Sequence, residues 1–259
     1  DLNQWAKLIN IAKKNKLEFI CSPFSEMAVE NLKKLQVKTL KIPSGELTNL
    51  AMLKKIKSLF PNILLSTGMS NWKEIDQAYN IIKNVKNLCV MQCSSIYPCP
   101  PENVGLNIID ELKKRYKGVV GFSDHTRGYA AAFASVALGC RVIEKHFSFS
   151  REMYGSDAFN SMIPDEMKVF CEGLRFIWKS LDNPVNKDKI KIYQDVRKTF
   201  QKSIVTSKSV KKGEKLSLKN ICFKKPGYGI PADKINDILN KKFCYDLSKD
   251  HLLKTKDIK

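Results

Sequence analysis

Short apolar runs alternate with longer amphipathic stretches along the first 180 residues of the chain. Six apolar runs begin near residues 17, 39, 62, 88, 119 and 141, and each ends in small or polar residues. The intervening stretches place apolar residues at helical spacing, over residues 1–16, 26–35, 50–59, 72–84, 106–116, 129–138 and 164–180. Short buried strands that alternate with amphipathic helices predict an α/β fold with a parallel sheet covered by helices.

The strand–helix units recur every 22 to 31 residues. A repeat of this length is typical of the (β/α)₈ TIM barrel, in which eight parallel strands close into a cylinder. The pattern supplies about six of those eight units. On the pattern alone, an incomplete barrel and an open six-stranded sheet are both consistent with the chain.

Two neighbouring strands are predicted to end in polar segments that contain histidine. The run at 119–122 is followed by the tetrapeptide SDHT and the run at 141–143 by EKH, so His125 and His146 end adjacent strands. The carboxyl ends of parallel strands meet at one edge of a sheet, where active sites collect. Two imidazoles placed there can share a divalent metal ion, or each can line the site as a hydrogen-bonded residue that binds no metal. No HExxH or similarly compact ligand motif is present.

The character of the chain changes after residue 180. Residues 181–195 are polar and contain Pro184, which predicts a linker between a domain at 1–180 and a second one at 196–259. The second domain has short β-like runs at 203–206 and 221–223 and turn signals at 212–213 and 226–229. This pattern predicts a small domain with short strands and few long helices.

The formal net charge is +19, and it is uneven, because residues 196–259 carry 17 Lys and Arg against 6 Asp and Glu. A basic domain can bind nucleic acid. Here, however, the lysines are scattered, few aromatic residues lie among them, and no helix-turn-helix or RNP-type motif is present. An anionic substrate explains a basic cleft equally well, and we do not expect nucleic acid as a partner.

The other bulk properties are those of an ordinary globular protein, with 43% hydrophobic residues. No apolar run approaches the roughly 18 residues that cross a membrane, and the first 19 residues predict an amphipathic helix rather than a signal peptide. The eight cysteines include no CxxC pair. We therefore expect reduced thiols and a cytoplasmic location, with no membrane partner.

The segment SDHT, followed about twenty residues later by EKHF, resembles the sialic acid synthase family. Four further segments agree with that family in order and spacing: KIPSGE at 41–46, STGM at 66–69, CSSIYP at 93–98 and YGSD at 154–157. The resemblance covers essentially the whole chain. It implies a TIM barrel followed by a small antifreeze-like (SAF) domain, and it implies that residue 1 lies beyond the first two strands of that barrel.

The activity implied by the resemblance is that of a phosphoenolpyruvate-dependent transferase that forms a carbon–carbon bond. Such an enzyme condenses phosphoenolpyruvate with N-acetylmannosamine or a related hexosamine, giving N-acetylneuraminate or a related nonulosonate and phosphate. Legionaminate and pseudaminate synthases are variants of this prediction that differ in the sugar substrate. An alternative interpretation is that the chain is a non-catalytic, truncated carbohydrate-binding remnant, since two strands are expected to be missing.

The resemblance also implies roles for individual residues. His125 and His146 match metal ligands and take part in catalysis; Mn²⁺ is expected first, with Mg²⁺ and Co²⁺ as alternatives. Glu46 matches a carboxylate that acts on water or protons. The remaining matches are to substrate-contacting positions, on the phosphoenolpyruvate side or on the sugar side: Lys41, Ser44, Ser66, Ser123, Lys202, Tyr97 and Asp157.

Two substrate positions depart from the family pattern. Ser95 stands where a phosphate-contacting asparagine is common, and Lys225 stands where an arginine usually contacts the sugar's N-acyl group from the partner subunit. A lysine cannot supply the planar donor pair of a guanidinium, so the identity of the acyl group is left open. The resemblance further implies a homodimer in which the SAF domain lies over the partner's barrel.

Overall fold

The computed structural model describes residues 1–259 and divides after Pro184 into two compact units. The first unit, residues 1–184, contains one sheet of six parallel strands in the order β1-β2-β3-β4-β5-β6. The strands are β1 (Ile20–Cys21), β2 (Thr39–Ile42), β3 (Asn62–Ser66), β4 (Asn87–Cys93), β5 (Val119–Asp124) and β6 (Val142–Lys145). The six predicted strands are all present, and their strictly sequential order is that of a βα barrel.

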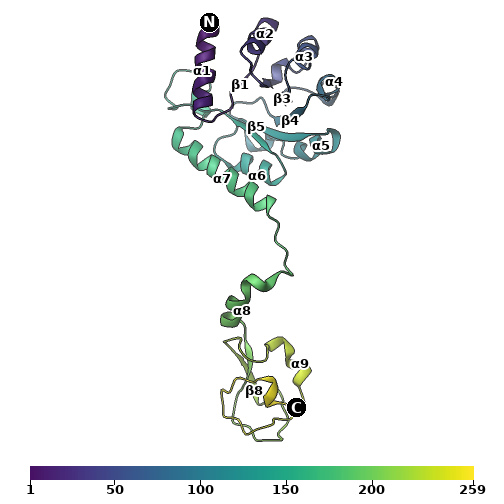
Figure 1. Ribbon diagram of the computed structural model, residues 1–259, viewed down its shortest axis with the longest axis vertical. Coiled ribbons are helices and arrows are strands. Elements are labelled where there is room, and N and C mark those ends of the chain that lie inside the picture. The colour runs from purple at the N-terminus through teal and green to yellow at the C-terminus, as the bar shows by residue number, and fades with distance from the viewer. The chain divides into compact units, whose positions relative to one another are not determined.

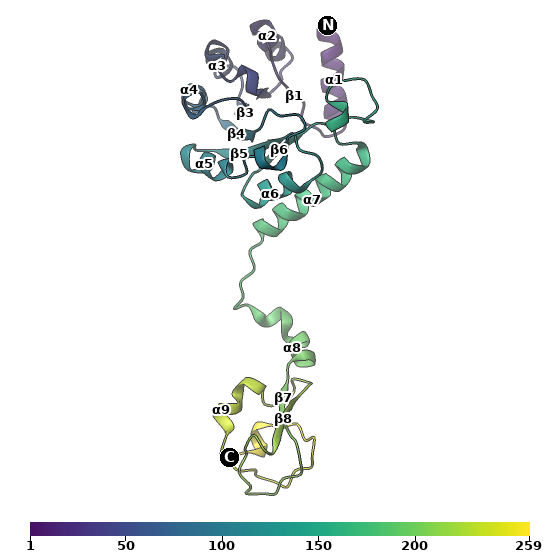
Figure 2. The ribbon, with the colours of Figure 1, turned by 180° about the vertical axis from the view of Figure 1, so that it is seen from behind.

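One helix precedes the first strand, and a helix follows each strand and covers one face of the sheet (Figures 1 and 2). They are α1 (Leu2–Lys14), α2 (Glu26–Lys34), α3 (Leu50–Ile56), α4 (Trp72–Ile82), α5 (Ile108–Arg115), α6 (Ala130–Ala137) and α7 (Pro164–Asp182). Several begin at a side chain that accepts a hydrogen bond from the first turn, as Ser25 does for α2 and Asn71 for α4. None of the helices is long and apolar enough to span a membrane.

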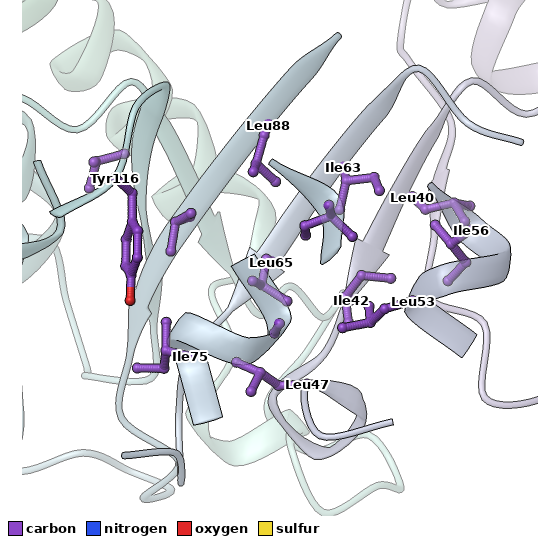
Figure 3. Packing of buried hydrophobic residues seen from close by; sticks show 14 of the residues in the cluster. Leu40, Ile42, Leu47, Leu53, Ile56, Ile63, Leu65, Ile75, Leu88 and Tyr116 are labelled. Carbon is purple, nitrogen blue, oxygen red and sulfur yellow. The ribbon is translucent and has the colours of Figure 1, made fainter. Parts of the chain in front are cut away.

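The strands alternate between a helix-covered face and an inner face. Leu40, Ile42, Ile63 and Leu65 point to the helices and are fully buried in the main core, as Figure 3 shows. The residues between them, such as Lys41, point to the inner face, because successive side chains of a strand lie on opposite sides. The inner face therefore holds the polar residues and the helix-covered face holds the core.

The sheet is strongly curled. Lys41 on β2 and Glu144 on β6 are joined by an ion pair of 2.9 Å, although three strands lie between them in the sheet. In a flat sheet, strands four positions apart would be separated by about 19 Å, which is beyond the reach of these two side chains. The contact therefore requires a curved, half-barrel sheet, which confirms the barrel-type fold predicted from the repeat.

The second unit, residues 185–259, has a small core of its own. An antiparallel pair, β7 (Ser203–Thr206) and β8 (Ile221–Lys224), packs with loops around Ile204, Leu216 and Phe243, which are fully buried. Two short helices, α8 (Gln194–Phe200) and α9 (Ile235–Ile238), complete it. The short strands were predicted, whereas α8 begins at the end of the segment that we expected to be only a linker.

Candidate active site

A cavity of about 470 Å³ opens on the inner face, at the carboxyl ends of the strands. This is the place where parallel α/β sheets carry their chemistry. Its walls come from β2, β3, β4, β5, β6 and the loops that follow them. The lining includes eight of the residues predicted from the sequence: Lys41, Ser44, Ser66, Ser95, Tyr97, Ser123, His125 and His146.

One side of the cavity is built around a buried cation. Lys41 is only 7% exposed, and its Nζ donates to Glu144 Oε1 at 2.9 Å. The same carboxylate oxygen accepts a hydrogen bond from Ser123 Oγ at 2.8 Å. A lysine is rarely buried without an anionic partner. The second oxygen of Glu144 has no hydrogen-bond donor, and the carboxylate is partly exposed to the cavity.

Several hydroxyl groups line the same cavity as this cation. Ser66 is 1% exposed, and its Oγ has no hydrogen-bond partner although it is buried at the cavity wall. Ser44 and Ser95 belong to neighbouring loops, and their hydroxyl groups both lie close to Gly68, where a larger residue would not fit. A Cβ at Gly68 would lie 2.4 Å from Ser95 Oγ and 2.7 Å from Ser44 Oγ. A buried donor without a partner is unfavourable, so this corner of the cavity suits an anion that accepts several hydrogen bonds.

The two histidines line the same cavity. Their ring centroids are 5.3 Å apart, and the ring of Tyr97 stacks on His125 with centroids separated by 4.1 Å. His125 Nδ1 lies 2.7 Å from the carbonyl oxygen of Ser94. A carbonyl oxygen only accepts, so Nδ1 carries the proton and Nε2 of the neutral ring keeps its lone pair.

The electrostatic surroundings of the histidines differ. Burial alone lowers the pKa of His125, but its contacts with Cys93 and the Ser94 carbonyl outweigh burial and raise that pKa above the ordinary value. Burial lowers the pKa of His146, and Asp157, whose Oδ2 lies 3.5 Å from His146 Nδ1, offsets this only in part. Burial raises the pKa of the Cys93 thiol, yet hydrogen bonds with His125 and Ser44 bring it below the ordinary value.

The residues present fit a divalent cation held in an open site. Two neutral imidazoles on neighbouring strand ends, with the Nε2 lone pair of His125 available, supply two nitrogen ligands. No group of three or more His, Cys, Asp or Glu side chains is arranged to enclose a metal ion. A cation here would therefore take its remaining ligands from substrate and water, as catalytic metal sites do.

The other predicted site residues lie outside the cavity lining. Glu46 is in the 3₁₀ turn that contains Ser44, and its carboxylate accepts a hydrogen bond from Asn49 at 2.9 Å. Asp157 is exposed beside His146. Lys202 and Lys225 belong to the second unit, where Lys225 Nζ lies 5.0 Å from the centroid of the Phe200 ring.

Two cavity residues were missed in the sequence. Glu144 was read only as part of the EKH motif, although it lies two residues before His146 and so faces the same side of β6. Cys93 was expected only as one of the reduced thiols, yet its Sγ lies 4.0 Å from His125 Nδ1. Strand alternation could have indicated Glu144. Nothing in the sequence pattern pairs Cys93 with a histidine 32 residues later.

Two models of known protein families match the sequence of this chain. The model of the NeuB family matches residues 1–186, and that of the SAF domain matches residues 201–259. The chain belongs to the NeuB family. The predicted resemblance to sialic acid synthases with a C-terminal SAF domain is thereby confirmed.

Several relatives of the chain are named as synthases. The chain is 40% identical to the N,N'-diacetyllegionaminic acid synthase of Campylobacter jejuni, over 98% of this chain and 77% of that protein. It is 30% identical to the human N-acetylneuraminate-9-phosphate synthase, over 96% and 70% of the two chains. A crystal structure of N-acetylneuraminic acid synthetase from Leptospira borgpetersenii in complex with citrate matches with a TM-score of 0.69 and 27% identity, over 77% of this chain and 71% of that one. The NeuB chain described here is thus a member of an enzyme family.

Proposed function

We propose that this NeuB-family chain condenses phosphoenolpyruvate with an N-acylated hexosamine, giving a nonulosonate and inorganic phosphate. The observation that carries the proposal is the pairing of two features within one cavity. A buried lysine and an unpartnered buried hydroxyl, Lys41 and Ser66, form an anion corner, and the two imidazoles of His125 and His146 line the same cavity. Phosphoenolpyruvate needs the first feature, and a polarised aldehyde needs the second.

The bond changes define what the cavity must do. The methylene carbon of phosphoenolpyruvate bonds to the aldehyde carbon of the open-chain sugar, and the aldehyde oxygen takes a proton. Water adds to the pyruvyl carbon, and phosphate then leaves as that carbon becomes a ketone. Lys41, Ser44, Ser66 and Ser123 hold the phosphate and carboxylate oxygens through charged and hydroxyl donors. They orient the enol carbon toward the histidine side of the cavity.

A divalent cation, with Mn²⁺ as the first candidate, would be held by His125 and His146 and would polarise the aldehyde oxygen when bound. Tyr97 stacks on His125 and thereby limits the orientation of that ring. Asp157 lies beside His146, where it can accept hydrogen bonds from sugar hydroxyls. These side chains position the sugar so that its aldehyde faces the anion corner.

A carboxylate is needed for the water and proton steps. Glu46 is the residue implied by the resemblance, and it lies two residues from Ser44. Glu144 lines the cavity and already contacts Lys41 and Ser123. We assign the water and proton steps to these two carboxylates, with Glu144 the closer one to the anion corner.

The sugar has two leading candidates. N-acetylmannosamine is the substrate that the sequence motifs indicate first. The 40% identity to a protein named N,N'-diacetyllegionaminic acid synthase favours a hexose that carries two acetamido groups. Lys225 takes the place of the arginine expected at the acyl contact, and Ser95 takes the place of an asparagine. The precursor of pseudaminate is a third sugar, supported by relatives of 30% identity.

The proposal is tested by identifying the product. The chain is incubated with phosphoenolpyruvate, Mn²⁺ and each of the three sugars in turn, and the products are analysed by mass spectrometry. We expect one nonulosonate whose mass is that of the sugar plus pyruvate, and none with His125→Ala. Folded protein that gives no such product with any sugar would favour the carbohydrate-binding remnant instead. Sedimentation velocity would test the expected homodimer.

A further inference from the structure

A second ion pair lies behind the histidines, on the other face of the same two strands. Asp124 and Lys145 are direct register partners on β5 and β6 and immediately precede His125 and His146. Lys145 Nζ lies 2.7 Å from Asp124 Oδ2, and the two side chains are 2% and 0% exposed. Strand alternation places this pair on the helix-covered side, away from the imidazoles.

The pair also fixes the backbone of Thr126, the residue directly after His125. Asp124 Oδ1 accepts a hydrogen bond from the backbone N–H of Thr126 at 2.8 Å. Lys145 Nζ donates to the carbonyl oxygen of Thr126 at 2.6 Å. His125 therefore lies between Asp124, which is bound to Lys145, and Thr126, which is bound to both members of the pair. Its own carbonyl accepts from the backbone N–H of Cys99 and from Asn160 Nδ2, both at 2.9 Å.

The energetics argue against a purely stabilising role. Removing two charges from water is costly, and apolar residues of similar volume often stabilise a fold as well as a buried ion pair does. Part of the space around this pair is apolar, with Phe122 and Ile143 on the same side of β5 and β6, although Lys145 also borders a cavity lined by Arg127 and Asn160. Apolar side chains at 124 and 145 could fill this space, but they could not hold the Thr126 backbone by hydrogen bonds to its N–H and C=O.

We propose that the Asp124–Lys145 pair positions the two imidazoles of the cation site without contacting the cation. It joins the ends of β5 and β6 one residue before each histidine, and it fixes the turn that presents the His125 ring to the Ser94 carbonyl. The spacing of the rings and the Nδ1–H form of His125 then follow from this pair. The inference rests on the proposed function through the two-histidine cation site.

The test uses the double variant Asp124→Asn/Lys145→Met, because a single change would leave a buried charge unpaired and could prevent folding. The matched control is Arg141→Met/Asp182→Asn, which removes an exposed ion pair joining the residue before β6 to α7. Histidine is labelled with ¹⁵N, and the chain has three histidines. His251, paired with Asp257 in the second unit, serves as an internal reference.

Two readouts are taken at one fixed alkaline pH: the ring ¹⁵N shifts without metal, which report the tautomer, and the Mn²⁺ affinity from electron paramagnetic resonance. We expect His125 to show a single Nδ1–H form in the wild type and averaged shifts in the double variant. Mn²⁺ affinity falls by about 10- to 100-fold, the usual effect of losing a partner that orients metal ligands. His251 and the control variant are unchanged.

The outcomes separate this inference from the proposed function. A folded double variant with unchanged His125 shifts would overturn the positioning role, whatever the metal affinity. Wild-type protein that binds no Mn²⁺, combined with altered His125 shifts in the double variant, would uphold the positioning role and remove the cation from the proposed function.

Discussion

Glu144 and Lys145 are consecutive residues of β6, and each forms an ion pair, but the two pairs lie on opposite faces of the sheet and differ in exposure. Glu144 pairs with Lys41 on the inner face, where its side chain is 39% exposed. Lys145 pairs with Asp124 on the helix-covered face, where both side chains are almost completely buried. The first pair opens onto a cavity and can exchange partners with an incoming anion. The second is almost completely buried and holds two strand ends together. Because successive residues of a strand face opposite sides, Glu144 faces the substrate cavity, whereas the next residue, Lys145, faces the core and can position the histidines.

The largest effect is expected on stability, from Lys145→Met. This change leaves the Asp124 carboxylate buried without its cation, which costs about 3–5 kcal/mol of unfolding free energy. Lys41→Met is the contrasting change on the inner face, and we expect it to cost less than about 1 kcal/mol, because it leaves unpaired only the Glu144 carboxylate, which is 39% exposed. Urea unfolding of both variants measures the difference, and equal losses would contradict the distinction between the two faces.

The next largest effect is expected on catalysis, from Lys41→Met. This substitution removes the buried cation of the anion corner, and kcat/KM for phosphoenolpyruvate should fall by about 10²- to 10³-fold. Lys55→Met is the control, since Lys55 is bound on the surface to Glu26 and Glu30. Steady-state phosphate release distinguishes the two lysines. Similar losses in both variants would show that net charge, rather than the cavity, governs the rate.

Ser66→Ala should act in opposite directions on stability and binding. Its buried hydroxyl lacks a partner in the free protein, so removing it should raise the unfolding free energy by about 1 kcal/mol. The same change removes a donor to the bound anion and should raise KM for phosphoenolpyruvate by about tenfold, the equivalent of one hydrogen bond to a charged group. Denaturation and kinetics are measured on the same preparation. A loss of stability would show that the hydroxyl has a structural partner.

The smallest effect is a pH dependence of cation binding. The imidazolium form cannot bind a cation, and the pKa of His125 is raised above 6.5 while that of His146 is lowered. As the pH falls through the raised pKa of His125, that ring gains a proton and Mn²⁺ affinity should drop by about tenfold per pH unit. The decline should therefore begin above pH 6.5. Titration calorimetry across this range measures it, and affinity that is constant until well below 6.5 would contradict the assignment of His125 as the limiting ligand.

Much of the fold and half of the site could be predicted from the sequence. Short apolar runs that end in polar residues placed six strands and their carboxyl ends, and with them His125 and His146, whereas Lys41 and Ser66 were implied by the resemblance to the sialic acid synthases. The role of Glu144 was missed because the motif was interpreted only through its histidine, whereas the curl of the sheet brings Glu144 to Lys41 across the three strands that lie between them. Helix α8 was missed because its residues are exposed and its composition resembles that of a linker.

Phosphate release from phosphoenolpyruvate tests the central claim most directly, namely that the inner cavity is where the two substrates react. The chain is assayed with Mn²⁺, with and without N-acetylmannosamine or its diacetamido counterpart, beside Lys41→Met and the control Lys55→Met. We predict release that requires one of the sugars, persists in Lys55→Met and is lost in Lys41→Met. Release that continues without sugar, or that Lys41→Met leaves unchanged, would contradict a reaction in this cavity.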